Sequence, residues 1–128
     1  MGKKNKKRKL RGTSRPDELT GLVSNQRIYG LAGDDVISTV EGKFKAWGGK
    51  GHDTFVTLNG GDGYLQVMDF EVGNKIQFCG CASTRIEQRG RNAWIVKSSD
   101  VKAVLRGVDA DELELDFTKG LIAFAADF

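Results

Sequence analysis

Two glycine-rich segments of this chain share one layout, and they constrain its fold more than any other feature. Residues 30–38 read Gly-Leu-Ala-Gly-Asp-Asp-Val-Ile-Ser, and residues 48–56 read Gly-Gly-Lys-Gly-His-Asp-Thr-Phe-Val. The glycine-rich head of each segment disfavours a helix or an ordinary strand, whereas the tail has the composition of a short strand. Asp35 and Asp53 are 53 − 35 = 18 residues apart, which is two units of nine. The sequence therefore predicts tight turns that alternate with short strands at a nine-residue period.

Five units of this length run from residue 21 to residue 65 without an insertion, and two of them are clean. Short repeats of this kind build a coil that advances by stacking, in which each unit buries its apolar residue against its neighbours. Because two units complete one coil, the turns that carry Asp35 and Asp53 are expected on the same edge. The eighth residue of each unit is expected to point inward: Ile28, Ile37, Ala46, Phe55 and Tyr64.

The composition agrees with a single all-β domain. The 128 residues fit one domain, and 17 glycines with one proline and no long helical periodicity favour a turn-rich β architecture. No apolar stretch approaches the roughly 20 residues that a membrane-spanning helix needs. The basic N-terminus is not followed by the apolar core of a cleavable signal peptide.

The repeat resembles the nonapeptide of the RTX, or hemolysin-type calcium-binding, family. The similarity extends past the repeats to residues 64–78, 92–97, 103–109 and 110–113, which look like the strands and the final short turn or helix that close the family's domain. The resemblance implies a right-handed parallel β-roll over residues 19–65. It also implies C-terminal capping strands over residues 66–117 of the same domain. The alternating patterns at residues 85–89, 92–97 and 102–108 independently predict antiparallel strands.

A calcium site is predicted where the two clean turns meet. Ca²⁺ takes 6 to 8 oxygen ligands from carboxylates and backbone carbonyls, so one turn cannot surround it but two stacked turns can. Asp35 and Asp53 supply the pair of carboxylates. The resemblance implies that the remaining ligands are the carbonyls of Leu31, Gly33, Gly48 and Lys50. The alternative is that both aspartates cap turns without an ion.

The opposite edge has an eroded pattern and is expected to bind metal weakly or not at all. The residues at its aspartate position are Gln26, Phe44 and Asp62, so a pair of turns there holds at most one carboxylate. Asp62 is a possible weak ligand. Asp69 is either a further weak ligand or a strand-end aspartate that caps a turn. The remaining turn residues of the intact edge, Asp34 and His52, are expected to face solvent.

Positive charge is concentrated at the N-terminus. Residues 1–16 carry eight basic side chains and no acid, which leaves 20 − 8 = 12 basic against 17 acidic groups in the remainder. Residues 1–18 are therefore expected to form a disordered basic arm, which is either merely solvated or binds a polyanion such as acidic polysaccharide or nucleic acid. In the polyanion-binding alternative, exposed Lys43, Lys45 and Lys50 are expected to contact the polyanion together with the arm. The arm's candidate contact residues are Lys3, Lys4, Lys6, Lys7, Arg8, Lys9 and Arg11.

Residues 118–128 and the cysteines bear on where the protein works. The apolar C-terminal segment is either a last edge strand or, by resemblance to the family, a type I secretion signal. Cys79 and Cys81 form a Cys-Gly-Cys, for which two free thiols are expected because a bridge across one residue is short. The resemblance implies a secreted, extracellular or cell-surface location. Because exported members of the family tend to avoid cysteine, Cys79 and Cys81 leave a particle-bound or intracellular location as the alternative.

The sequence thus predicts a non-enzymatic calcium-binding module, ordered by Ca²⁺ and exported by type I secretion. The single histidine, His52, lies in a glycine-rich turn whose backbone already belongs to the predicted calcium site. Neither a histidine-dependent triad nor a histidine-rich metal site is therefore expected. The alternatives are a polyanion-binding module that uses the basic arm and a structural module of a cell surface or virion. The oligomeric state is not specified by any pattern in the chain.

Overall fold

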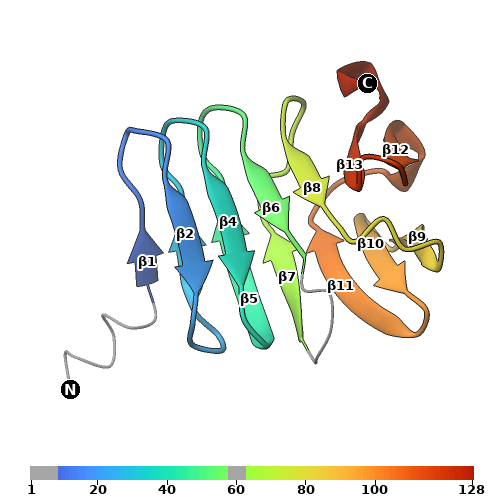
Figure 1. Cartoon of the computed structure of the whole chain (residues 1–128), viewed down its shortest axis with the longest axis horizontal. Coiled ribbons are helices and arrows are strands. Elements are labelled where there is room, and N and C mark those ends of the chain that lie inside the picture. The colour runs from blue at the N-terminus through green and yellow to red at the C-terminus, as the bar shows by residue number, and fades with distance from the viewer. Residues whose placement is uncertain (1–8, 58–62) are drawn as a thin grey trace.

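The protein is a β-solenoid of about four coils with a C-terminal cap, as seen in a computed structural model that describes residues 9–57 and 63–128 (Figure 1). Each coil contributes one strand to each of two sheets. The coil strands are β1 (Lys9–Arg11), β2 (Glu18–Gly21), β3 (Arg27–Tyr29), β4 (Val36–Thr39), β5 (Gly42–Trp47), β6 (Thr54–Val56), β7 (Gly63–Val67) and β8 (Lys75–Gln77).

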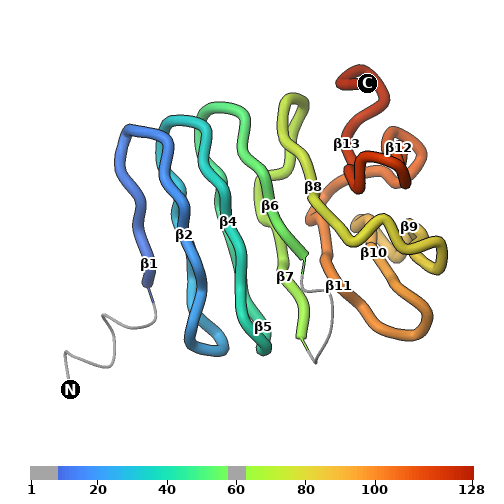
Figure 2. Tube along the Cα trace, viewed as in Figure 1, coloured from blue at the N-terminus to red at the C-terminus, as the bar shows by residue number. Residues whose placement is uncertain are grey.

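The cap completes both sheets. Sheet A has the order β1-β3-β5-β7-β11-β10-β9, and sheet B has the order β12-β13-β8-β6-β4-β2. Figure 2 shows the coils advancing from the N-terminus to the cap, which lies beyond β7 and β8. The cap elements are β9 (Thr84–Arg89), β10 (Asn92–Lys97), β11 (Asp100–Leu105), β12 (Leu113–Asp116), β13 (Leu121–Phe124) and the 3₁₀ helices η1 (Ala110–Glu112) and η2 (Ala125–Asp127).

The eighteen-residue coil predicted from the repeats is confirmed by the strand register. Val36 pairs with Thr54 and Ile37 with Phe55 in parallel strands, so the turns of Asp35 and Asp53 lie on one edge. Four of the five residues expected to point inward, Ile28, Ile37, Ala46 and Phe55, are fully buried. The predicted parallel β-roll with antiparallel capping strands is therefore the observed architecture.

The last coil is longer than the sequence pattern indicated. Lys43 pairs with Tyr64, and Thr54 pairs with Lys75, so in both sheets the final step is 21 residues instead of 18. The prediction that no insertion interrupts residues 21–65 is therefore wrong by three residues. As a result Leu65, which pairs with Phe44, is buried. Tyr64 was expected to point inward, but it is only partly buried.

The solenoid also begins earlier than predicted. Residues 9–18 were expected in a disordered arm, but β1 pairs in parallel with β3 and β2 pairs with β4. Leu10 faces the core between exposed Lys9 and Arg11, so the out-in-out alternation of a strand outweighs the local charge. Of the predicted arm, residues 1–8 lie outside the described part of the chain.

The C-terminal segment is built into the cap. β13 lies between β12 and β8, so it is an internal strand and not an edge strand, and Ile122 and Ala123 are fully buried. Phe70 packs against Phe55 in the coils, with ring centroids 6.2 Å apart, and against Phe124 in the cap, at 5.6 Å. No helix in the described residues has the length and apolarity that crossing a membrane requires.

The two cysteines are joined. Cys79 and Cys81 form a disulfide, so the prediction of two free thiols is wrong. Gly80 between them has φ +72°, a left-handed conformation that glycine adopts without steric cost and that turns the chain sharply enough to bring the sulfurs together.

Candidate metal centre

Four turns stack on the edge that carries Asp35 and Asp53, and we call this the aspartate edge. It consists of residues 12–17, 30–35, 48–53 and 69–74, which connect each sheet A strand to the sheet B strand of its coil. The last residues of these turns are Asp17, Asp35, Asp53 and Asn74. The structure therefore adds Asp17 and Asn74 to the pair identified from sequence.

Side chains on this edge hold the coils together through one repeated hydrogen bond. The backbone N–H of Asp17 donates to Oδ1 of Asp35 over 2.9 Å, and that of Asp35 donates to Oδ1 of Asp53 over 3.0 Å. The N–H of Asp53 donates in the same way to Oδ1 of Asn74 over 2.9 Å. Each bond needs only one oxygen, as the amide of Asn74 shows.

The second carboxylate oxygen of each central aspartate lacks a hydrogen-bond donor within the protein. Oδ2 of Asp35 and Oδ2 of Asp53 are buried and accept no hydrogen bond. Asp17 differs, since its Oδ2 accepts the N–H of Thr13 over 2.6 Å. A buried carboxylate oxygen without a donor is costly to keep charged. Among the buried carboxylate oxygens of this edge, those of the two aspartates that the repeat pattern identified are the ones left without a donor, and Nδ2 of Asn74 on the same edge is also buried without a partner.

Burial disfavours the ionised form of both carboxyl groups. Desolvation raises the pKa of Asp53 to about 7, against the lowering effect of the N–H of Asp35 and with the help of the negative charges of Asp35 and Asp69. Desolvation likewise raises the pKa of Asp35. These two groups would gain most from a cation, because a positive charge nearby favours the ionised form.

Carbonyl oxygens of the two central turns lie against glycines of the neighbouring turn. A β-carbon placed on Gly30 would lie 2.6 Å from Oδ2 of Asp35 and 2.7 Å from the carbonyl oxygen of Gly48. Both oxygens therefore face the same small space beside Gly30. From the other side, the carbonyl oxygens of Leu31 and Gly33 face Gly49 and Gly51, where a β-carbon would collide with them. Glycine at these positions is what lets the two turns approach so closely.

Backbone conformation directs these carbonyls. Leu31 has φ +69°, an uncommon left-handed conformation for a residue with a β-carbon, and Gly33 and Gly49 have φ +89° and +77°. Of the ligands predicted from sequence, Oδ2 of Asp35 and the carbonyl oxygen of Gly48 meet beside Gly30, and Oδ2 of Asp53 lies beside Gly48. The carbonyl oxygens of Leu31 and Gly33 face the neighbouring turn. Lys50 lies in the same turn with its side chain exposed.

The described residues of this edge offer a cation two buried carboxylates and several backbone carbonyls. No group of three or more His, Cys, Asp or Glu side chains that could hold a metal occurs within residues 9–57 and 63–128. A cation at the aspartate edge would therefore draw most of its ligands from backbone carbonyls, with carboxylates for charge. Hard cations with many oxygen ligands, such as Ca²⁺, have this preference.

The remaining predicted residues have other roles or lie outside the described chain. Both oxygens of Asp69 accept backbone hydrogen bonds, from the N–H groups of Gly48 and Gly49 over 2.8 and 2.9 Å, so Asp69 caps this turn. Asp34 and His52 are exposed as expected, and Oδ1 of Asp34 accepts the N–H of His52 over 2.8 Å. Asp62 lies outside the described residues.

The opposite edge is held without carboxylates in its described part. Oε1 of buried Gln26 accepts the N–H groups of Leu22 and Val23, and Phe44 is buried in the core. Sequence reasoning missed Asp17 and Asn74 on the aspartate edge. Asp17 was discoverable by subtracting 18 from 35, whereas the three added residues put Asn74 out of register.

Comparisons with known proteins add no family to this description. No protein-family model matches the chain, and no curated protein matches it.

Proposed function

We propose that this chain is a non-enzymatic calcium-binding module in which Ca²⁺ binds between residues 30–35 and 48–53 and stabilises the solenoid. The observation that carries the proposal is the pair of buried carboxylate oxygens, Oδ2 of Asp35 and Oδ2 of Asp53, that have no hydrogen-bond partner beside carbonyls directed into the same edge. The resemblance of the nonapeptides to the RTX family supports it from sequence.

Asp35 and Asp53 would supply the charge, and the carbonyls of Leu31, Gly33, Gly48 and Lys50 would supply further oxygens. A bound Ca²⁺ would offset the desolvation of both carboxylates and tie neighbouring coils together. Because an ion that binds only the folded chain stabilises it, the solenoid would gain stability with calcium concentration, by about 2.7 kcal/mol at one hundred times the Kd.

An extracellular location suits this function. The Cys79–Cys81 disulfide supports it, because disulfides persist in oxidising compartments and are rare in the reducing cytosol. We propose, in line with the RTX resemblance, that the chain is exported by type I secretion and folds where calcium is abundant. Expression with and without a type I exporter, followed by assay of the medium, tests this part separately.

The calcium proposal is tested with amide variants that keep the hydrogen bonds between successive turns of the aspartate edge. Asp35→Asn and Asp53→Asn retain an Oδ1 acceptor, as Asn74 does, but lose the charge. The melting temperature of the unaltered chain should rise with calcium and not with equal magnesium, and isothermal titration should give a stoichiometry near one. Both variants should fold and lose the calcium response.

Asp34→Asn is the matched control, because it removes the same charge one residue away at an exposed position. It should keep the full response. If the unaltered chain melts at the same temperature in calcium and in excess chelator, calcium binding at this edge is refuted.

A further inference from the structure

A column of positive charge runs across the outer face of sheet A. Lys9 pairs with Arg27 and Arg27 with Lys45 on successive parallel strands, so their side chains stand directly beside one another. Gln66 follows in register after Lys45 and accepts a hydrogen bond from the guanidinium of Arg106 over 3.2 Å. Lys43 stands on the same face, two residues before Lys45. We call this surface the basic face.

The column is not neutralised by the protein. Lys9, Arg27, Lys43 and Lys45 are exposed, and none of them forms an ion pair with any acid in the described residues. Neighbouring strands are about 4.8 Å apart, and like charges directly opposite one another on a sheet are destabilising. Three stacked cations therefore reduce the stability of the solenoid, and a partner that is itself anionic would offset this cost.

The basic face is hollowed where its strands lie side by side. A groove of about 580 Å³ crosses strands β1, β3, β5 and β7 and is lined by the four cations together with Asn25 and Tyr64. The ammonium group of Lys43 lies 5.9 Å from the ring centroid of Tyr64, which limits its freedom. The long axis of the cation column runs from coil to coil, along the solenoid.

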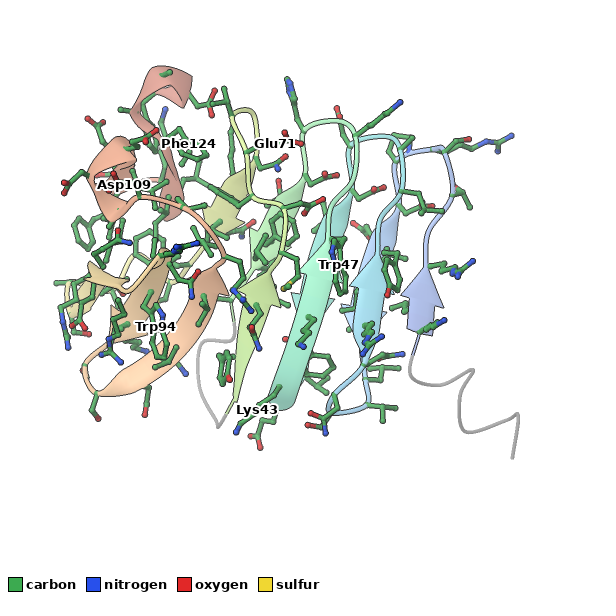
Figure 3. The ribbon with its side chains drawn as sticks, turned by 180° about the vertical axis from the view of Figure 1, so that it is seen from behind. Lys43, Trp47, Glu71, Trp94, Asp109 and Phe124 are labelled. Carbon is green, nitrogen blue, oxygen red and sulfur yellow. A yellow bond between two sulfur atoms is a disulfide. The ribbon has the colours of Figure 1, made fainter. Side chains whose placement is uncertain are left out.

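Two aromatic side chains of the same face, Tyr29 and Trp47, are packed against each other instead of standing open to nucleic-acid bases. Tyr29 and Trp47 stack on each other with ring centroids 4.8 Å apart and planes inclined by 10°. The guanidinium of Arg11 lies 6.0 Å from the centroid of Tyr29. Figure 3 shows Trp47 on the same face as Lys43. Proteins that bind single-stranded nucleic acid use open ring faces for stacking, and here Tyr29 and Trp47 each cover one face of the other.

We propose that the basic face binds a linear acidic polysaccharide with an anionic group on each sugar, laid along the column of Lys9, Arg27 and Lys45. Cations repeat at the strand spacing of about 4.8 Å, which is of the order of the length of one sugar unit in an extended chain. Each successive anionic group would meet one coil. Lys43 and Arg106 would contact the chain from the sides. This site is independent of the calcium proposal, since it lies on a sheet face and not on the aspartate edge.

The test measures binding of the full-length chain, in calcium-containing buffer, to chondroitin sulfate, which has an anionic group on every sugar. Hyaluronan carries one on alternate sugars, dextran is neutral, and oligo(dT) tests the nucleic-acid alternative. Affinity should fall in the order chondroitin sulfate, hyaluronan, dextran and should decrease steeply with salt. Tighter binding of oligo(dT) than of chondroitin sulfate would overturn the proposal.

Paired variants locate the site. Arg27→Gln with Lys45→Gln should lower the affinity for chondroitin sulfate about tenfold or more, since contacts with charged groups are being removed. Lys75→Gln with Lys119→Gln removes the same charge from exposed positions on β8 and beside the cap, and should change affinity by less than about twofold. Equal losses in the two pairs would mean that net charge and not the basic face is recognised.

Two further measurements keep the result interpretable. The Arg27→Gln, Lys45→Gln chain should melt at or above the temperature of the unaltered chain, because repulsion is relieved, so lost binding would not reflect lost folding. A chain that lacks residues 1–8 should retain the difference between the two variant pairs. If removing these residues abolishes binding while the face variants bind normally, the basic N-terminal segment and not the face is the site.

Discussion

Asp53 divides its carboxylate between two tasks. Oδ1 accepts the N–H of Asp35 and so aligns two coils, whereas Oδ2 is buried against Gly48 without a hydrogen-bond donor. Asn74 makes the same inter-coil bond with an amide, so the ladder alone does not require a carboxylate. The second oxygen is therefore the feature of Asp53 that a cation would explain.

A pH dependence follows at the same residue. The pKa of Asp53 is raised from 3.8 to about 7 by burial, so between these values the folded chain binds more protons than the unfolded chain. Stability in excess chelator should then fall as pH rises through this window and level off above it. The raised pKa of Asp35 acts in the same direction.

Urea unfolding in chelator at about pH 5 and about pH 8 checks this prediction. Asp53→Asn should show a smaller decrease in the free energy of unfolding than the unaltered chain. Saturating calcium should also reduce the decrease, because the ion favours the ionised carboxylates. If stability in chelator rises over this range, or if Asp53→Asn leaves the slope unchanged, the assignment of the buried proton to Asp53 is wrong.

At the level of single elements, the glycine-rich turns set how closely the coils approach. A β-carbon on Gly49 would collide with the carbonyl oxygen of Leu31 in the neighbouring turn. Gly49 also has φ +77°, so both its backbone conformation and the close approach of the neighbouring turn require a residue without a β-carbon. Gly90, in the turn between β9 and β10, has φ +60° but no atom within 4 Å of where its β-carbon would be.

Comparing these two glycines separates backbone strain from close packing. Gly90→Ala should cost about 1–2 kcal/mol, the penalty of a left-handed conformation for alanine. Gly49→Ala should cost roughly 3 kcal/mol or more, since the turns must also move apart, and it should weaken the calcium response. Chemical unfolding of both variants with and without calcium measures this. Equal losses would show that the turns are not in close contact at Gly49.

At the scale of the whole molecule, the coil was predictable from sequence because its period is local and repeated. Inward Ile28, Ile37 and Phe55 and the shared edge of Asp35 and Asp53 all follow from counting. Counting failed at Tyr64, because the last coil is three residues longer than the others and the repeat pattern does not mark the added residues. The hydrogen bond from the N–H of Asp53 to Asn74 was not predicted for the same reason.

Long-range pairing explains the other differences. Lys9-Leu10-Arg11 has the composition of a solvated arm, and only its neighbour β3 makes it a strand. Residues 121–124 were equally compatible with an edge strand and with a signal segment, and their position between β12 and β8 is decided by contacts distant in sequence. The basic face also arises from register across coils, since Lys9, Arg27 and Lys45 are 18 residues apart and no local motif marks them.

The position of β13 predicts that the C-terminal segment is needed for folding. Removing residues 118–128 takes fully buried Ile122 and Ala123 from the core, uncovers the edge of β8 and breaks the hydrogen bond from the N–H of Gly73 to Oδ2 of Asp127. Loss of the Ile122 side chain alone corresponds to about 1.5–3 kcal/mol of burial. The truncated chain should therefore unfold at a clearly lower urea concentration and bind a hydrophobic dye.

Removal of Phe128 alone is the control, because this side chain is 49% exposed and should contribute less than about 0.5 kcal/mol. If the chain without residues 118–128 unfolds at the same urea concentration as the full chain, β13 contributes nothing to stability and the segment behaves as a separable tail, as an export signal would. If it is destabilised as expected, any export signal in these residues must be read before the cap forms, since afterwards its apolar residues are buried between β12 and β8.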